Sequence, residues 1–533
     1  MDTGLLDLAS TSWNDFLSLA PASAAHSRDN GSLTLRFLDN FTKRTGLVES
    51  FDCGTYELRR MVLDQAQQKH GVWQNAIAPL QLDKSLTIDP LDVRCHEVVA
   101  LVKEVAMFRP KNSAVDVTWS DVTHDMCSQF FAPANIRTYL ELYWSIWHPN
   151  VNIVHRPTFE PIAAKSALLA AMAVIGACVS PNRIDKDDAR VWFNAVEELV
   201  FTDDDFCSDE SGLTDDPPNR SKIQAMQAAY IVCLYQNWEG SDSAKRRIRR
   251  HRFSTLVSVA RDIELHNARH IQYTNRAEFD WSAFAAREEL IRTCLWIFLL
   301  DTAFVIFNNL PPRMVIKEMA MDLASCEAVF QAESADVCFR TFQRKSQNFA
   351  LQLPRVVGTF YRAAEILCKA ELDDLSRQQL ADLGPLNLFA ITSSLHSMIF
   401  HYQNNFGSES QLVPIRNALE NWKMVWTEYT HELALNPDHA PLGSAIITPS
   451  NMWKRIGFMR HASDYWLLAS LILDRICITE HQPSDGEAEL VSDSLASSNA
   501  AEQKLYPVLQ KYDETSMQQV NDLIAHFQQT TIS

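Results

Sequence analysis

Glycine is scarce in this sequence, with 14 glycines in 533 residues, and no two of them lie within seven positions of each other. A loop that cradles a phosphate needs clustered glycines, because the backbone itself must approach the anion. Nucleotide-binding loops of both common kinds are therefore excluded. The shortage also disfavours a sheet built from tight hairpins, whose turns depend on glycine.

Basic side chains are in deficit. The 48 Lys and Arg residues stand against 66 Asp and Glu residues, which gives a formal net charge of −18. Proteins that coat nucleic acid neutralise its phosphates with an excess of Lys and Arg. The chain as a whole does not fit that class, and only a local basic strip could contact DNA directly.

Closely spaced cysteines are missing as well. The 11 cysteines are scattered, and no two of them form a C-x-x-C pair, which is the spacing that closes a tetrahedral zinc site. Such usage is typical of a reduced intracellular protein whose thiols pack as small apolar groups. We expect no metal site.

Catalytic motifs are also absent from the sequence. His-Glu pairs begin at His96 and His431, but the second histidine of a zinc protease would fall at Ala100 or Leu435. No G-x-S-x-G motif is present either. We therefore predict no catalytic residue, no cofactor and no enzymatic activity.

Two apolar runs resemble membrane spans. Residues 166–180 are too few for a span of about 20 residues. Residues 290–310 are long enough but carry Arg292 and Asp301, so a buried core helix is the better interpretation. We predict no membrane association.

The apolar residues of this sequence recur mainly with the period of an α-helix. Apolar residues recur one turn apart in several segments, including Ile223, Met226 and Tyr230, whereas no alternating strand pattern of any length occurs. The expected fold is all-α, a large irregular helical array. Its central helix should cover 290–307 and stop before the Pro pair at 311–312.

Composition divides the chain into four parts. Residues 1–34 are predicted to be a flexible leader, and residues 35–480 a helical domain. An acidic and Ser-rich linker at 481–503 then leads to a helical C-terminal tail at 504–533.

Two histidines flank a proline-containing turn. His148 and His155 are either a metal or acid/base pair, or part of a partly buried turn whose imidazoles pair with backbone groups. Proline between them prevents a shared helical face, so we favour the structural interpretation.

One basic run stands out in this acidic chain. It is either a nuclear-import or phosphate-contacting strip, or simply the solvated start of the helix that carries Phe253 and Leu256, which we favour. We call its six cations the basic strip: Lys245, Arg246, Arg247, Arg249, Arg250 and Arg252.

Residues 143–159 read YWSIWHPNVNIVHRPTF. This segment resembles the opening signature of the fungal-specific transcription factor domain, also called the middle homology region. Further segments are similar to the family in the same order along the chain: 37–55, 168–177, 224–228, 256–266 and 287–312. In one branch of the family, a segment similar to 37–55 comes directly after tandem zinc fingers.

The resemblance implies an all-α regulatory domain over about 35–480, in a nuclear regulator that acts on RNA polymerase II promoters. Such relatives often control specialised-metabolite gene clusters. The partners implied are DNA, the transcriptional machinery and a second subunit in a homo- or heterodimer.

The chain departs from the family pattern at the zinc fingers, because it has no closely spaced cysteine pair that could form one. We therefore expect DNA contact through a DNA-binding partner, or else through the basic strip. Two alternatives stay open: a finger-less interaction module that titrates or dimerises with a DNA-binding relative, and a helical ligand-binding protein or enzyme.

Overall fold

The computed structural model describes residues 35–77, 89–109, 111, 113–208, 218–262, 265–271, 273, 275–350, 357–405, 409–435, 447–480 and 517–532. In this part of the chain the regular structure is helical, and the sole β pairing is an isolated bridge between Asp322 and Thr359. The all-α prediction is confirmed. The predicted leader and linker lie outside the described residues.

The α-helices are α2 (Arg36–Lys43), α3 (Leu47–Ser50), α4 (Tyr56–Ile77), α5 (Pro90–Met107), α6 (Asp121–Phe130), α7 (Pro133–Leu142), α8 (Ser166–Cys178), α9 (Arg183–Phe201), α10 (Asp204–Cys207), α11 (Arg220–Glu239), α12 (Asp242–Arg247), α13 (Phe253–Asp262), α14 (Trp281–Asn308), α15 (Glu327–Phe330), α16 (Ala335–Ala350), α17 (Phe360–Leu367), α18 (Asp374–Ala381), α19 (Pro385–Asn404), α20 (Leu412–Leu435), α21 (Ala462–Glu480) and α22 (Gln518–Ile532). Two π-helical turns, η3 (Tyr143–Trp147) and η5 (Ile248–Arg252), come directly after α7 and α12.

Side-chain caps define where several helices begin. Asn182, Asn219 and Asp280 precede α9, α11 and α14, and each side chain accepts a backbone N–H of the first turn. These bonds satisfy donors that have no partner within the helix. Short polar residues in the sequence therefore fix the starts of three long helices.

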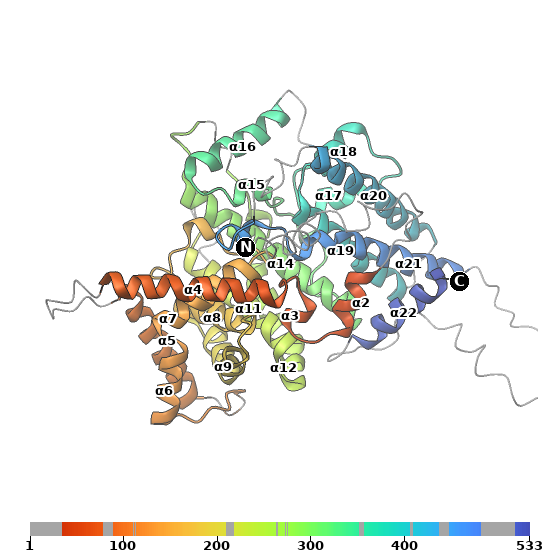
Figure 1. Ribbon diagram of the computed structural model, residues 1–533. Coiled ribbons are helices and arrows are strands. Elements are labelled where there is room, and N and C mark those ends of the chain that lie inside the picture. The colour runs from red at the N-terminus through yellow and green to blue at the C-terminus, as the bar shows by residue number, and fades with distance from the viewer. Residues whose placement is uncertain are drawn as a thin grey trace, which may run out of the picture.

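Helix α8 forms the centre of the N-terminal half, where it packs against α7, α9 and α11 (Figure 1). All 13 of its residues are buried. A Cβ added at Gly176 would lie 2.1 Å from the carbonyl oxygen of Tyr139, so only glycine lets α7 approach this closely.

Helix α14 is the central helix that the sequence predicted, although it begins nine residues earlier than expected. It ends at Asn308, and Asn309 adopts the left-handed conformation with φ +50° before Leu310 and the two prolines. Among the described helices it alone is long and apolar enough to cross a bilayer by itself, and 94% of its most apolar window is buried in the protein. Its burial confirms the prediction of a core helix.

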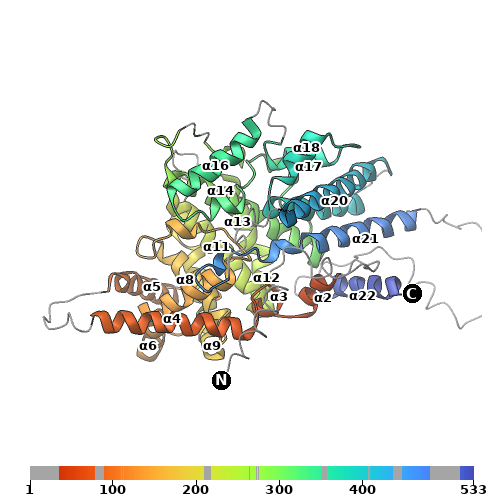
Figure 2. The ribbon, with the colours of Figure 1, turned by 45° about the horizontal axis from the view of Figure 1, so that its top comes forward.

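The two ends of the described chain meet. Helix α2 lies beside α21 and α22 in both views, where red and violet-blue ribbons adjoin (Figures 1 and 2). The Thr42 hydroxyl is 3.4 Å from Oδ1 of Asn521. Farther along, Arg460 contacts the carboxylate of Asp52 at 2.8 Å. The segments before and after the middle of the chain therefore form one packed unit.

Candidate functional site

The basic strip occupies α12 and η5, which run into α13. Its exposed cations are Arg246 and Arg250, four positions apart. Lys245 is half-buried, with Nζ 3.7 Å from Asp242. The outward part of the strip therefore consists of two arginines and the edge of one lysine, and these are the groups placed to meet a phosphate or an acidic receptor.

Two further arginines of the strip bind carboxylates inside the protein. Glu197 on α9 is fully buried and lies 2.7 Å from Arg247 and 2.9 Å from Arg252. Arg252 also contacts Glu198 at 2.8 Å. When buried charges are paired through hydrogen bonds, their mutual attraction offsets much of the cost of removing them from water. These arginines join η5 and α12 to α9.

Arg249 is the most buried cation of the strip, at 2% exposure. Its Nε donates to Oδ1 of Asn237 at 2.7 Å, and its carbonyl oxygen accepts from Arg313. Its guanidinium also lies 5.6 Å from the ring centre of Phe304. The favoured interpretation of the strip as a solvated face is wrong for Arg247, Arg249 and Arg252, because acceptors distant in sequence draw these side chains inward.

The histidines of the 143–159 segment are both buried. His148 has no exposed surface, neither ring nitrogen has a hydrogen-bond partner, and its ring lies 5.1 Å from that of Trp144. Burial, with a smaller contribution from Arg156, lowers the pKa of His148 well below its usual value. It is held as a neutral ring within the core.

His155 is equally enclosed, and its Nδ1 lies 2.8 Å from the Thr158 hydroxyl. Burial, with Arg220 and Arg292 nearby, lowers the pKa of His155 to about 3. The turn is fully rather than partly buried, and the expected pairing of both imidazoles with backbone groups is wrong for His148, whose ring nitrogens have no partner. His155 does pair with the backbone, at Phe330, as well as with the Thr158 hydroxyl.

Two asparagines between these histidines carry contacts that the sequence did not reveal. Asn150 accepts the N–H of Asp52 and donates to its carbonyl oxygen, both at 3.1 Å. Asn152 donates to Glu327 at 3.0 Å and accepts the indole N–H of Trp296 at 3.1 Å. The sequence offered one signal for these contacts: two amide side chains lie two positions apart within an apolar run.

The charges within α14 are paired in the same region. Arg292 has no exposed side-chain surface, and its Nε donates to Glu288 at 2.7 Å while its Nη1 donates to Glu327 at 3.2 Å. Asp301 accepts the N–H groups of Arg313 and Met314 at 2.7 and 2.8 Å. Burial raises the pKa of Asp301 to about 6. These groups hold the exit of α14 and the loop at 313–327.

In the described part of the chain, no three His, Cys, Asp or Glu side chains are grouped so that they could hold a metal ion. The buried cysteines are typical packing thiols: burial raises the pKa of Cys53, for example, to about 12. A thiol with such a pKa stays protonated and is a poor ligand or nucleophile.

Comparison with known proteins finds a family and several relatives that match this chain. The family model described as the fungal specific transcription factor domain matches residues 140–424, more than half of the chain. "Transcription factor verF" of Penicillium polonicum is 48% identical over 538 aligned positions, which cover 94% of this chain and 71% of that protein.

Two proteins of Schizosaccharomyces pombe are more distant. "Zinc finger protein zas1" is 21% identical over 215 residues, which are 39% of this chain and 22% of that protein. "Zinc finger protein klf1" is 21% identical over 212 residues, which are 39% of this chain and 26% of that protein. No solved structure matches the chain.

Proposed function

Because this chain belongs to the family of the fungal specific transcription factor domain and is a fungal transcription regulator, we propose that it acts in the nucleus on RNA polymerase II promoters. The observation that carries the proposal is the 48% identity to a protein named as a transcription factor, extending over 94% of this chain. Agreement of that length includes the segments on both sides of residues 140–424, which the family model does not match.

Contact with DNA runs through a DNA-binding partner in this proposal. The arrangement of the basic strip supports it. Arg247 and Arg252 are engaged by Glu197 and Glu198, which leaves the strip few outward cations for phosphates. Neutralising several phosphates takes several accessible Lys and Arg side chains. The two exposed arginines fit better with a receptor that carries proteins into the nucleus.

The relatives indicate the partner class. Two proteins named as zinc finger proteins align with this chain over 215 and 212 residues, at 21% identity in each case. A finger-bearing protein with a similar helical region is therefore the partner we propose for a heterodimer. In that complex the partner reads the DNA, and this chain engages the transcriptional machinery.

Chromatin immunoprecipitation with sequencing, on the tagged protein in the fungus that encodes it, tests the proposal. We expect discrete promoter peaks with a shared motif beneath them. An even genomic background, with the tag outside the nucleus, would overturn it.

A reporter assay separates the effector role from DNA contact. The chain is fused to an unrelated DNA-binding domain and expressed in a host that lacks finger-bearing relatives. A change in reporter transcription supports regulation by this chain itself. An unchanged reporter, together with heterodimers in the native host, favours the titrating interaction module instead.

We further propose that the targets form a specialised-metabolite gene cluster, as the family resemblance suggests. Transcript profiling after deletion of the gene tests this. Coordinated change in one contiguous set of genes is expected, whereas change dispersed among housekeeping genes would contradict it.

A further inference from the structure

A groove runs along the outer face of helix α4. Its volume is about 610 Å³, within the range of about 300–1,000 Å³ that is usual for binding sites. Two large apolar side chains in it meet solvent, because Tyr56 is 54% exposed and Met61 is 43% exposed. The residues that line the groove include Tyr56, Arg60, Met61, Asp64, Gln68 and Pro449.

The packing of α4 explains why this face is open. Leu58, Val62 and Ala66 lie one turn apart on the helix and are buried, and α7 is the described helix against which α4 packs most extensively. The residues that line the groove repeat with the same spacing on the other side of α4. The helix therefore has one covered face and one face that the described elements leave largely open.

The sequence before the first described residue contains a segment that matches such a groove. Residues 12–19 read SWNDFLSL. Trp13, Phe16 and Leu17 have the i, i+3, i+4 spacing of the anchors with which an amphipathic helix binds a groove. Ser12 and Asp15 have the S-x-x-D spacing that is typical of a helix start. The segment thus combines an apolar face with a local signal for helix.

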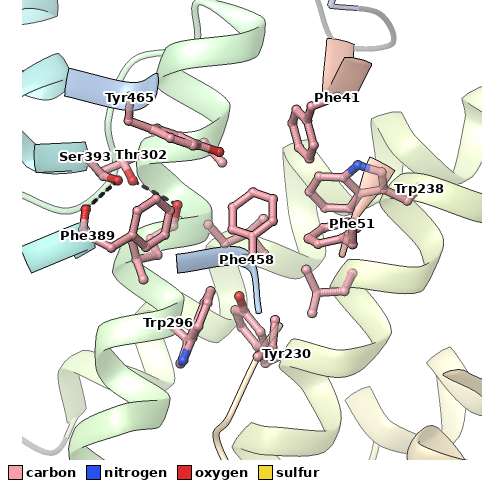
Figure 3. Close-up of a pocket in the computed structure, with 15 residues that line it drawn as sticks. Phe41, Phe51, Tyr230, Trp238, Trp296, Thr302, Phe389, Ser393, Phe458 and Tyr465 are labelled. Atoms are coloured by element: carbon pink, nitrogen blue, oxygen red, sulfur yellow. Dashed lines mark hydrogen bonds between the residues drawn. The ribbon is translucent and has the colours of Figure 1, made fainter. Parts of the chain in front are cut away.

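Tertiary contacts bring the attachment point of this segment towards the groove. The ring of Phe41 on α2 lies 5.8 Å from that of Phe51, and Figure 3 shows both rings on the same side of Phe458. Leu35 is six residues before Phe41, and Tyr56 is five residues after Phe51, so Leu35 lies within about 40 Å of Tyr56. The 15 residues 20–34 span up to about 50 Å when extended, which is enough to reach it.

We propose that the groove on α4 is the docking site for residues 12–19 of the same chain. In the docked state Trp13, Phe16 and Leu17 bury their side chains against Tyr56 and Met61. The short tether keeps the segment at a high local concentration beside the groove, so it binds there in preference to the same segment of another chain.

Docking makes the segment and the groove compete with other proteins for each other. A partner that binds residues 12–19 must first withdraw them from α4, and a partner that binds the groove must displace them. The inference goes beyond the proposed function and does not depend on it, because docking is measured on the purified chain.

Site-specific photocrosslinking of the full chain tests the proposal. Tyr56 is replaced by p-benzoylphenylalanine, and the peptides joined to it after irradiation are identified by mass spectrometry. We expect crosslinks to residues 12–19. The same probe in place of Val413, which is 50% exposed on α20, should give none to that segment. An equal mixture of ¹⁵N-labelled and unlabelled chains distinguishes crosslinks within a chain from those between chains.

Two triple variants of the segment before Leu35 test which residues dock. Trp13→Ser, Phe16→Ser and Leu17→Ser together should lower the yield of crosslinks from position 56 about tenfold or more, because the apolar anchors are lost. The matched control removes three apolar side chains outside residues 12–19 and should lower the yield less than about twofold. Its substitutions are Leu5→Ser, Leu6→Ser and Leu8→Ser.

Melting curves confirm that each variant is folded. Crosslinks to residues 12–19 within one chain, lost only in the variant of Trp13, Phe16 and Leu17, support the proposal. Crosslinks that form only between labelled and unlabelled chains would overturn it and make a second copy the occupant of the groove. Absence of crosslinks to residues 12–19, or equal yields in the two triple variants, would also overturn it.

Discussion

The carboxylate of Asp464 accepts the backbone N–H of Phe37 at 3.1 Å, across 427 positions of sequence. Phe37 lies in the first turn of α2, whose own N-cap residue supplies no side-chain acceptor. Asp464 lies near the start of α21. A helix near the end of the chain therefore caps the first described helix.

This cap predicts a pH dependence of stability. Burial raises the pKa of Asp464 from 3.8 to about 6, while the N–H groups of Phe37 and Leu38 act in the opposite direction. Between these values the folded protein holds a proton that the unfolded chain releases. The contribution of Asp464 to stability is therefore greatest below about pH 4 and is lost as the pH rises to about 6.

Replacement of Asp464 by Asn should remove that dependence, because the amide keeps an acceptor oxygen and carries no charge. Relative to wild type, Asp464→Asn should gain on the order of 3 kcal/mol between pH 4 and pH 7. Asp464→Ala should be about 1 kcal/mol less stable than Asp464→Asn, because it loses the cap. Urea unfolding at both pH values measures these differences, and an equal pH dependence in Asp464→Asn and wild type would contradict the prediction.

The contact between α7 and α8 gives a second prediction. Gly176→Ala should destabilise the fold by about 2–4 kcal/mol, because the methyl group meets the backbone of Tyr139 and two helices must separate. Gly358→Ala is the matched control, since no atom lies within 4 Å of the added Cβ. It should be neutral or stabilising by up to about 1 kcal/mol. Comparable losses in the two variants, measured by thermal melting, would show that the close approach is not what makes Gly176 necessary.

The fold was largely predictable from sequence because its signals are local. Apolar residues one turn apart identify helices, and Asn309 with the two prolines after Leu310 marks the end of α14. The start of α14 was missed because the continuous apolar run begins only at Leu290, after the two charged residues Glu288 and Glu289. Both glutamates are buried, at 0% and 2% exposure, because Arg292 and Arg220 pair with them.

The candidate site was less predictable because its determinants are tertiary. Six cations within eight positions read as one uniform charged strip. Nothing near them in sequence shows that Glu197 lies against Arg247 and Arg252, about 50 positions away. The same holds for Asn152, whose partners Glu327 and Trp296 lie on later elements. Which side of a charged segment faces inward depends on neighbours that only the fold supplies.

The carboxylate that receives two arginines gives a third prediction. Glu197→Gln should destabilise the protein by about 3 kcal/mol, because removing one charge leaves Arg247 and Arg252 partly buried without their main acceptor. Glu49→Gln is the control, as Glu49 pairs with Arg44 on the surface and should change stability by less than about 1 kcal/mol. Denaturant midpoints decide between these values, and a loss below about 1 kcal/mol for Glu197→Gln would mean that the buried pairs contribute little.

The outward arginines of the basic strip give the last prediction, which concerns nuclear import. Arg246→Gln with Arg250→Gln should lower nuclear accumulation of the tagged chain and should lower its melting temperature less than substitution of the inward-facing arginines does, because both side chains are exposed. Arg247→Gln with Arg252→Gln should lower the melting temperature, since it breaks the contacts to Glu197. Arg60→Gln with Arg183→Gln removes the same charge from exposed positions elsewhere.

Only the Arg246 and Arg250 variant should change localisation while the protein stays folded and abundant. Because the import receptor needs cations that it can reach, Arg246 and Arg250 are the members of the strip that must carry the signal. Fluorescence imaging scored against protein abundance separates import from degradation. If the Arg246 and Arg250 double variant stays nuclear, the strip is not the import signal. The role of the basic run is then structural, through the contacts of Arg247 and Arg252 with α9.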